Sequence, residues 1–134
     1  MPDIVSKMEA IKNLYHLTGC TDQEIEKAQQ ALGLRFSDEY VKYVKAYGAV
    51  SFYATEWTGL NVEGYLNVVE ATMQERNLNP DFPDDCYVIE NQDLNGSVIV
   101  SDSSGSVSVI QEGQRSEICR SLLEYLEICL RRMT

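Results

Sequence analysis

The stretch LGLRFSDEYVKYVKAYGAVSF, residues 32–52, is the part of this sequence that decides the fold. It contains the end of one helix, a short link, a second helix and the beginning of a strand. Gly33 can end the first helix, because a residue without a Cβ readily adopts the left-handed conformation. Ser37 can cap the second helix with its hydroxyl, and Gly48 stops that helix. We therefore expect a helix-to-sheet corner on which the other elements pack.

The second helix of this stretch has a buried face. Tyr40, Val44 and Tyr47 recur at helical spacing and form an apolar stripe. Asp38 and Glu39 fall in the first turn, where negative charge interacts favourably with the helix dipole. This helix carries no catalytic group, so its role is structural.

Two helices are predicted before this corner. The first covers residues 3–17 and is amphipathic. The second begins at Thr21, which forms a capping box with Glu24, because each side chain satisfies the other's free backbone N–H. The apolar face of the first helix consists of Ile4, Met8, Ile11 and Tyr15.

After the corner, the pattern changes to strands and turns. Residues 50–62 are predicted as strand and turn, and Asn67 begins a short helix over residues 68–76. Residues 77–85 contain two prolines and three aspartates, a composition that excludes regular structure throughout. These segments connect the corner to the C-terminal half.

The C-terminal half predicts an antiparallel meander followed by a helix. Residues 86–90, 97–101 and 106–110 have strand character, and Asn95-Gly96 is a strong hairpin turn. The last helix is expected to begin after a cap at Ser116 and to run to about Arg132. It would then carry Cys119 and Cys129.

The predicted fold is α+β, as a single domain over residues 1–134. It has N-terminal helices, a central antiparallel sheet built as a meander, and a C-terminal helix packed on that sheet. A chain of 134 residues is long enough for one hydrophobic core. Its apolar and charged fractions, 44% and 24%, are those of an ordinary globular protein.

The charge balance restricts the kind of partner. The chain has 21 acidic and 11 basic residues, a formal net charge of −10. This charge repels nucleic-acid phosphates, so direct nucleic-acid binding is not expected. It attracts a cationic partner and speeds the encounter. The alternative is that the acidity serves only solubility.

No sequence feature indicates a membrane, a metal or a cofactor. No apolar run approaches the roughly 20 residues that span a bilayer, and the N-terminus does not resemble a signal peptide, so a cytoplasmic location is expected. The four cysteines form no C-x-x-C pair and only one histidine is present, which argues against zinc. We expect reduced thiols packed as small apolar groups.

The sequence also lacks the signatures of common enzymes. It contains no G-x-S-x-G, no phosphate-binding glycine loop and no H-E-x-x-H. His16 has no nearby nucleophile in the sequence to activate. Carboxylates such as Glu56, Glu63, Glu90 and Asp93 could form an acid–base pair, but they are too numerous here to be specific. We expect a protein that is not an enzyme.

The remaining candidate is a protein-binding surface. Acidic residues are concentrated in the predicted loops, and aromatic side chains commonly anchor interfaces. Trp57 is equally consistent with a place in the core. The residues expected to contact a partner are Glu56, Trp57, Asp84, Asp85, Glu90, Asp93 and Asp102.

A series of short motifs follows the order of the predicted elements. These motifs are Leu32-Gly33, Tyr40, Tyr43-Val44, Gly48, Tyr87-Val88-Ile89-Glu90, Asn95-Gly96, Val98-Ile99-Val100, Asp102-Ser103-Ser104-Gly105, Val107-Ser108-Val109 and Ser121-Leu122-Leu123-Glu124-Tyr125-Leu126. With the order of elements, they resemble the SUKH superfamily, the Smi–Knr type, over residues 22–131. The family's usual Leu-Pro and Gly-Gly are replaced here by Phe36-Ser37 and Gly48-Ala49.

This resemblance implies an α+β domain whose bacterial members are immunity proteins. Such proteins bind and neutralise a cognate toxin, often a nuclease, in a stoichiometric complex. The expected partner is therefore a cationic toxin domain, and the acidic balance is consistent with this. The alternative is a regulatory interaction module with an endogenous partner.

Overall fold

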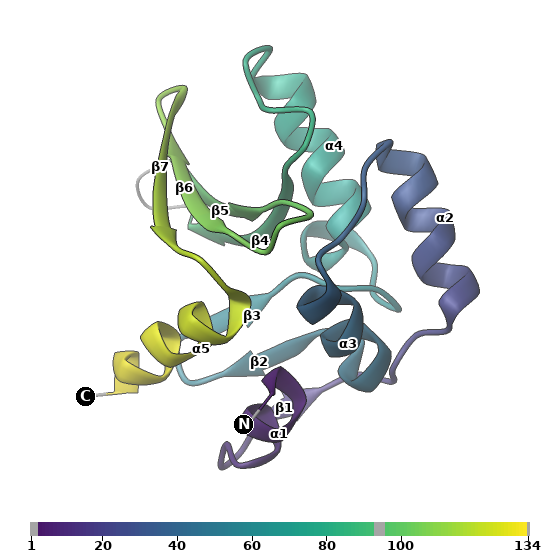
Figure 1. Cartoon of the computed structure of the whole chain (residues 1–134), viewed down its shortest axis with the longest axis vertical. Coiled ribbons are helices and arrows are strands. Elements are labelled where there is room, and N and C mark those ends of the chain that lie inside the picture. The colour runs from purple at the N-terminus through teal and green to yellow at the C-terminus, as the bar shows by residue number, and fades with distance from the viewer. Residues whose placement is uncertain (1–2, 93–95, 134) are drawn as a thin grey trace.

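The computed structural model describes residues 3–92 and 96–133, and it confirms the α+β fold with a C-terminal helix (Figure 1). The described helices are α1 (Ile4–Glu9), α2 (Asp22–Leu32), α3 (Asp38–Tyr47), α4 (Val68–Leu78) and α5 (Leu122–Leu130), with 3₁₀ turns η1 (Gly64–Leu66) and η3 (Arg131–Met133). The described strands are β1 (Tyr15–His16), β2 (Val50–Phe52), β3 (Thr55–Trp57), β4 (Tyr87–Gln92), β5 (Ser97–Ser101), β6 (Val107–Gln111) and β7 (Gln114–Cys119).

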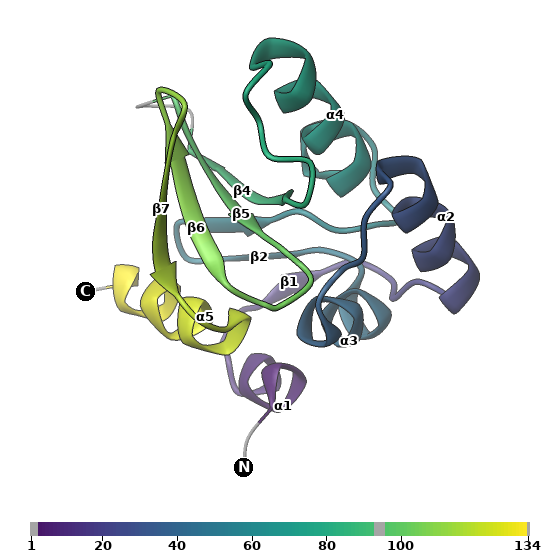
Figure 2. The ribbon, with the colours of Figure 1, turned by 45° about the horizontal axis from the view of Figure 1, so that its top comes forward.

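The strands form two antiparallel sheets where the sequence predicted one. The smaller sheet has the order β1-β2-β3 and the larger has the order β4-β5-β6-β7. The two sheets meet where the N–H of Thr58 donates to the carbonyl of Ile89 at 2.8 Å. Figure 2 shows α4 beside the larger sheet, with α3 and α5 below them in this view. Asp93, one of the predicted contact residues, lies outside the described residues.

The predicted helix ends at Thr21, Gly33 and Ser37 are confirmed. Thr21 and Glu24 form the capping box, and Gly33 ends α2 with a φ of 68°. The hydroxyl of Ser37 accepts from the N–H of Tyr40 at 3.2 Å. These ends depend on contacts within a few residues, which explains why the local sequence predicts them.

The first helix is shorter than predicted. It ends at Glu9, and the expected helical stretch over residues 3–17 contains instead a turn and the strand β1. Asn13 in the turn has a φ of 63°, which a continuing α-helix does not allow. Tyr15 and His16 pair with Ser51 and Val50. This pairing crosses about 35 residues of sequence, so helical periodicity near the N-terminus does not reveal it.

The last helix starts later than predicted. Residues 114–119 form β7, which makes a fourth strand of the meander, and Ser116 pairs with Val109 instead of capping a helix. Glu112 and Gly113 have φ values of 53° and 79° and close a two-residue hairpin turn. The cap of α5 is Ser121, whose hydroxyl accepts from the N–H of Glu124 at 3.1 Å. Cys119 therefore ends a strand.

Aromatic side chains connect the two sheets through the main core. Trp57 is fully buried and stacks on Tyr125 of α5 with ring centroids 5.9 Å apart. The phenol of Tyr43 donates to the carbonyl of Thr58 at 2.8 Å and accepts from the N–H of Val50 at 3.1 Å. A second, smaller core beneath α4 includes Phe82 and Val98.

Three glycines allow the chain to cross itself beside the end of α3. A Cβ on Gly59 would lie 1.7 Å from the carbonyl oxygen of Gly48, and one on Gly19 would lie 1.9 Å from that of Lys45. The N–H of Leu60 donates to the carbonyl of Gly48 at 3.0 Å across this crossing. The segments before α2, after α3 and after β3 are thus in backbone contact, which side chains at Gly19 or Gly59 would prevent.

We predict that Gly59→Ala destabilises the protein by about 3 kcal/mol or more, because a backbone oxygen cannot yield to the new methyl group. Gly33→Ala is the matched control. Its Cβ would enter open space, so only the left-handed backbone is penalised, by about 1 kcal/mol. Urea unfolding followed by circular dichroism compares the two. Equal losses of stability would contradict the importance of the crossing.

Candidate protein-binding surface

The predicted contact residues lie in three separate places. Trp57 and Glu90 are buried, with 0% and 6% of their surface exposed. Asp84, Asp85 and Asp102 lie around the loops before β4 and after β5. Glu56 is exposed on β3. The structure thus divides the predicted set instead of gathering it into one patch.

Glu90 acts inside the protein. Its carboxylate accepts a hydrogen bond from the phenol of Tyr125 and another from Arg132 at 2.7 Å. Arg132 also donates to the hydroxyl of Thr55 at 3.1 Å. Burial raises the pKa of the Tyr125 phenol, which therefore stays protonated and able to donate. These contacts attach the turn after α5 to β4 and β3, and Trp57 packs beside them.

The loop aspartates surround one cation. Arg115 of β7 lies 3.0 Å from the carboxylate of Asp102 and 3.6 Å from that of Asp85. Asp84 is exposed, and its backbone carbonyl accepts from Arg76 at 3.2 Å. We call Asp85, Asp102 and Arg115 the Arg115 cluster. Because Arg115 offsets part of its negative charge, the cluster attracts a cationic partner less than its carboxylates alone would.

Glu56 lies on the outer face of the smaller sheet. Residues Tyr15, Ser51 and Glu56 are direct neighbours across the three strands, so their side chains share one face. The phenol of Tyr65 donates to both carboxylate oxygens of Glu56, at 3.0 and 3.2 Å. We call the surface formed by Tyr15, Ser51, Glu56 and Tyr65 the Glu56 face.

A groove of about 390 Å³ runs along the Glu56 face. Half-buried Leu17, Val62 and Leu66 give it apolar walls. Tyr15 is 67% exposed and Tyr65 is 58% exposed, so two aromatic rings border an exposed carboxylate. Among the described residues, no lysine, arginine or histidine forms an ion pair with Glu56. Aromatic rings beside an exposed polar group are typical of surfaces that contact other proteins.

Sequence reasoning identified Glu56 but not Tyr15 as part of this surface. Tyr15 was part of the apolar stripe of the predicted N-terminal helix. Its exposure follows from its pairing with Ser51 in the smaller sheet, which the sequence alone does not show. Alternation along β3 distinguishes Glu56 from Trp57, because successive side chains of a strand point to opposite faces. The structure also places the phenol of Tyr65 against Glu56.

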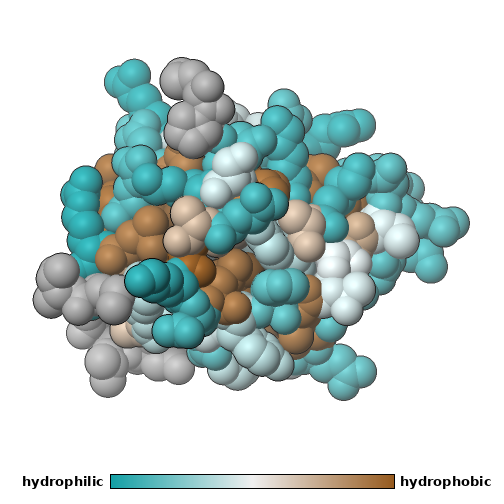
Figure 3. Space-filling view, turned by 90° about the horizontal axis from the view of Figure 1, so that it is seen from below, coloured by the Kyte–Doolittle hydropathy of each residue, from teal (hydrophilic) through white to brown (hydrophobic). Residues whose placement is uncertain are grey.

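A wider view of the surface shows where apolar side chains remain accessible. Figure 3 views the molecule from the side on which α1 and α5 lie, and hydrophobic side chains gather in the middle of that face with hydrophilic ones around them. Val5 and Ile128 are among the partly buried apolar residues of these helices.

The four cysteines are buried, and the histidine contacts the backbone. Burial raises the pKa of three thiols, to about 11 for Cys20 and Cys119 and about 12 for Cys86, so these cysteines stay protonated. The Nδ1 of His16 lies 2.9 Å from the carbonyl of Leu17. Within the described ranges, no group of three His, Cys, Asp or Glu residues is arranged to hold a metal ion.

Two antiparallel sheets, an aromatic core between them and a C-terminal helix on that core make this an α+β protein. The SUKH_5 family model, described as SMI1-KNR4 cell-wall, matches residues 1–131. The chain therefore belongs to this family. No curated protein matches it by sequence. None of the helices described in residues 3–92 and 96–133 is long and apolar enough to cross a bilayer.

We predict that Arg132→Met destabilises the protein by about 2 kcal/mol, because the carboxylate of Glu90 loses its cation while remaining buried. This value is below the usual range for a buried pair, since the Arg132 side chain is 26% exposed. Arg120→Met is the control, because Arg120 is exposed and makes no described ion pair. Thermal unfolding of both variants tests the difference, and equal stabilities would contradict it.

Proposed function

We propose that this protein is an immunity protein that binds a cognate toxin and neutralises it in a one-to-one complex. The toxin is proposed to be a cationic domain, such as a nuclease, and the protein to act in the cytoplasm without catalytic turnover. Membership of the SUKH family is consistent with this role. The net charge of −10 supports a cationic partner.

The observation that carries the proposal is the Glu56 face. An arginine or lysine of the toxin would place its cation on the carboxylate of Glu56 and its stem against Leu66 and Val62. The ring of Tyr15 would cover the cation from the side, an arrangement in which aromatic rings attract positive charge. Tyr65 already orients the carboxylate through its two hydrogen bonds, so binding requires little reorganisation.

Neutralisation would result because the protein covers the basic surface with which the toxin holds nucleic acid. A nuclease holds phosphates with basic residues, and a protein that places carboxylates and aromatic rings on those residues excludes the nucleic acid. Exposed Asp84 and the Arg115 cluster lie elsewhere on the surface and would add to the long-range attraction for a cationic partner. Asp93 remains a proposed contact residue, whereas Trp57 and Glu90 would support the surface from inside the protein.

We predict that Glu56→Lys weakens the complex with the toxin about thirtyfold, because it places like charges together at a contact centred on aromatic residues. Glu117→Lys makes the same charge change on β7, outside the Glu56 face, and should weaken it only slightly. Titration calorimetry with the purified toxin domain measures both affinities, and inhibition of toxin activity is followed in parallel. Equal effects of the two variants would reject the Glu56 face as the contact.

We also predict that Tyr15→Ala weakens the complex at least tenfold while the stability of the protein stays nearly unchanged. The Tyr15 side chain is mostly exposed in the free protein, so its loss costs little in folding but removes an aromatic anchor from the interface. Calorimetry and urea unfolding on the same sample separate the two effects. A large loss of stability would assign Tyr15 to the fold instead.

The association rate constant should fall as salt rises, because oppositely charged partners attract each other at long range. Stopped-flow measurements at low and physiological ionic strength test this, with the dissociation rate constant expected to change less. An association rate that does not depend on salt would contradict a cationic partner.

A regulatory interaction module with an endogenous partner is the second candidate. The description of the matching family refers to the cell wall, and this favours a partner in wall synthesis or signalling. The Glu56 face would serve either function. Affinity capture from the native host separates the two, because the first predicts a toxin whose activity the purified protein inhibits.

A further inference from the structure

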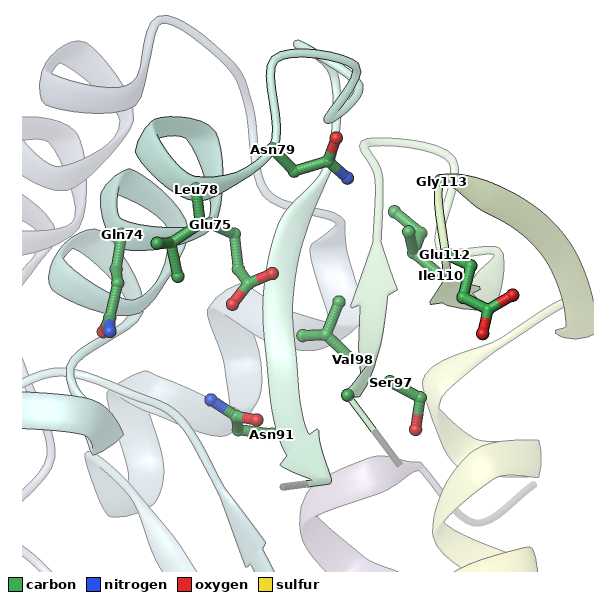
Figure 4. A pocket seen from close by; sticks show the side chains of 11 residues that line it. Gln74, Glu75, Leu78, Asn79, Asn91, Ser97, Val98, Ile110, Glu112 and Gly113 are labelled. Carbon is green, nitrogen blue, oxygen red and sulfur yellow. The ribbon is translucent and has the colours of Figure 1, made fainter. Parts of the chain in front are cut away.

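A pocket between α4 and the larger sheet lies apart from the Glu56 face. Its volume is about 510 Å³, within the usual range for ligand pockets. Buried Val98 and Ile110 form an apolar floor, and Leu78 of α4, which is 70% exposed, forms a lip. Figure 4 shows α4 on one side of this pocket and the strands on the other. We call it the Glu75 pocket.

The carboxylate of Glu75 points from α4 toward the sheet in this pocket (Figure 4). Its side chain is half-buried, and the described residues provide no hydrogen bond or ion pair to it. Burial raises the pKa of Glu75, which shows that the surroundings disfavour its charged form. A partly desolvated anion of this kind is stabilised by a cation that approaches through the pocket.

The other polar groups of the pocket favour a cation over an anion. Among the described residues that line the pocket, Glu112 is the one further ionisable residue, and none is a lysine, arginine or histidine. The side chains of Gln74, Asn79 and Asn91 carry amide oxygens that can accept hydrogen bonds from a cationic head.

The apolar residues of the pocket favour a ligand with a hydrocarbon part over a bare ion. A hydrocarbon stem would cover Leu78 and so remove exposed apolar surface from water. A hydrated metal ion would leave this surface exposed. The pocket therefore combines a negative head-group site with an apolar wall beside it.

We propose that the Glu75 pocket binds an alkyl cation, a primary ammonium or guanidinium group on an aliphatic stem, with Glu75 as its counter-ion. This site does not depend on the proposed immunity function, because it uses different residues on a different part of the surface. The ligand can be a free polyamine or a lysine or arginine side chain of another protein, since both present the same head and stem.

Two probes test the site and distinguish these sources. The first is 1,5-diaminopentane, and the second is Nα-acetyl-lysine methylamide, in which only the side chain is charged. NMR of the full chain follows the carboxyl resonance of Glu75 during titration with each. We expect saturable shifts and a lower pKa of Glu75 with the probe bound, because the cation favours the carboxylate. Binding should therefore weaken as pH falls through that pKa.

Binding of both probes indicates that the ligand is a lysine or arginine side chain of another protein. Binding of the diamine alone indicates a free polyamine. Glu75→Gln keeps the shape of the side chain and should weaken binding about tenfold. Glu117→Gln, outside the pocket, should bind normally. The proposal is overturned if neither probe shifts Glu75, if neutral 1-pentanol produces the same shifts, or if Glu75→Gln binds as tightly as the original protein.

Discussion

The contact between backbones at Gly19, Gly48 and Gly59 is the constraint on which the rest of the structure depends. It brings three segments together at one place: the link into α2, the corner after α3 and the segment after β3. The carbonyl of Gly48 can receive the N–H of Leu60 only because no side chain intervenes. Once this crossing forms, β1 is held beside β2, and the smaller sheet can pack its inner face on α3.

Buried hydroxyl groups then connect this crossing to the larger sheet. The hydroxyl of Thr58 donates to the carbonyl of Val88 at 2.6 Å, so the phenol of Tyr40, 3.0 Å away, must be the donor in their hydrogen bond. The phenol of Tyr87 accepts from the N–H of Ser37 at 3.0 Å, which ties β4 to the start of α3. Since unpaired buried polar groups destabilise a fold, these pairs specify one arrangement of the two sheets.

The acidic residues of this protein have different roles that composition alone does not separate. Glu90 lies in the interior beside Arg132, Asp102 is paired with Arg115, and Glu56 is exposed without a described cation. The negative net charge sets the long-range attraction for a cationic partner. Within the described residues, the carboxylates of Glu56 and Glu75 each lie beside apolar side chains without an ion pair, and we propose each separately as a place where a cation is held.

The sequence by itself determined the features that depend on near neighbours. These include the caps at Thr21, Ser37 and Asn67, the left-handed end of α2 and the α+β class. The sequence could not determine that residues 15–16 form a strand or that residues 114–119 leave the helical pattern, because both depend on pairing with distant or adjoining strands. The sequence also could not show that Trp57 is buried and Glu56 exposed, because this depends on which face of the smaller sheet packs on the core. Burial and pairing are properties of the folded chain, so only the tertiary structure decided which carboxylates and rings are available to a partner.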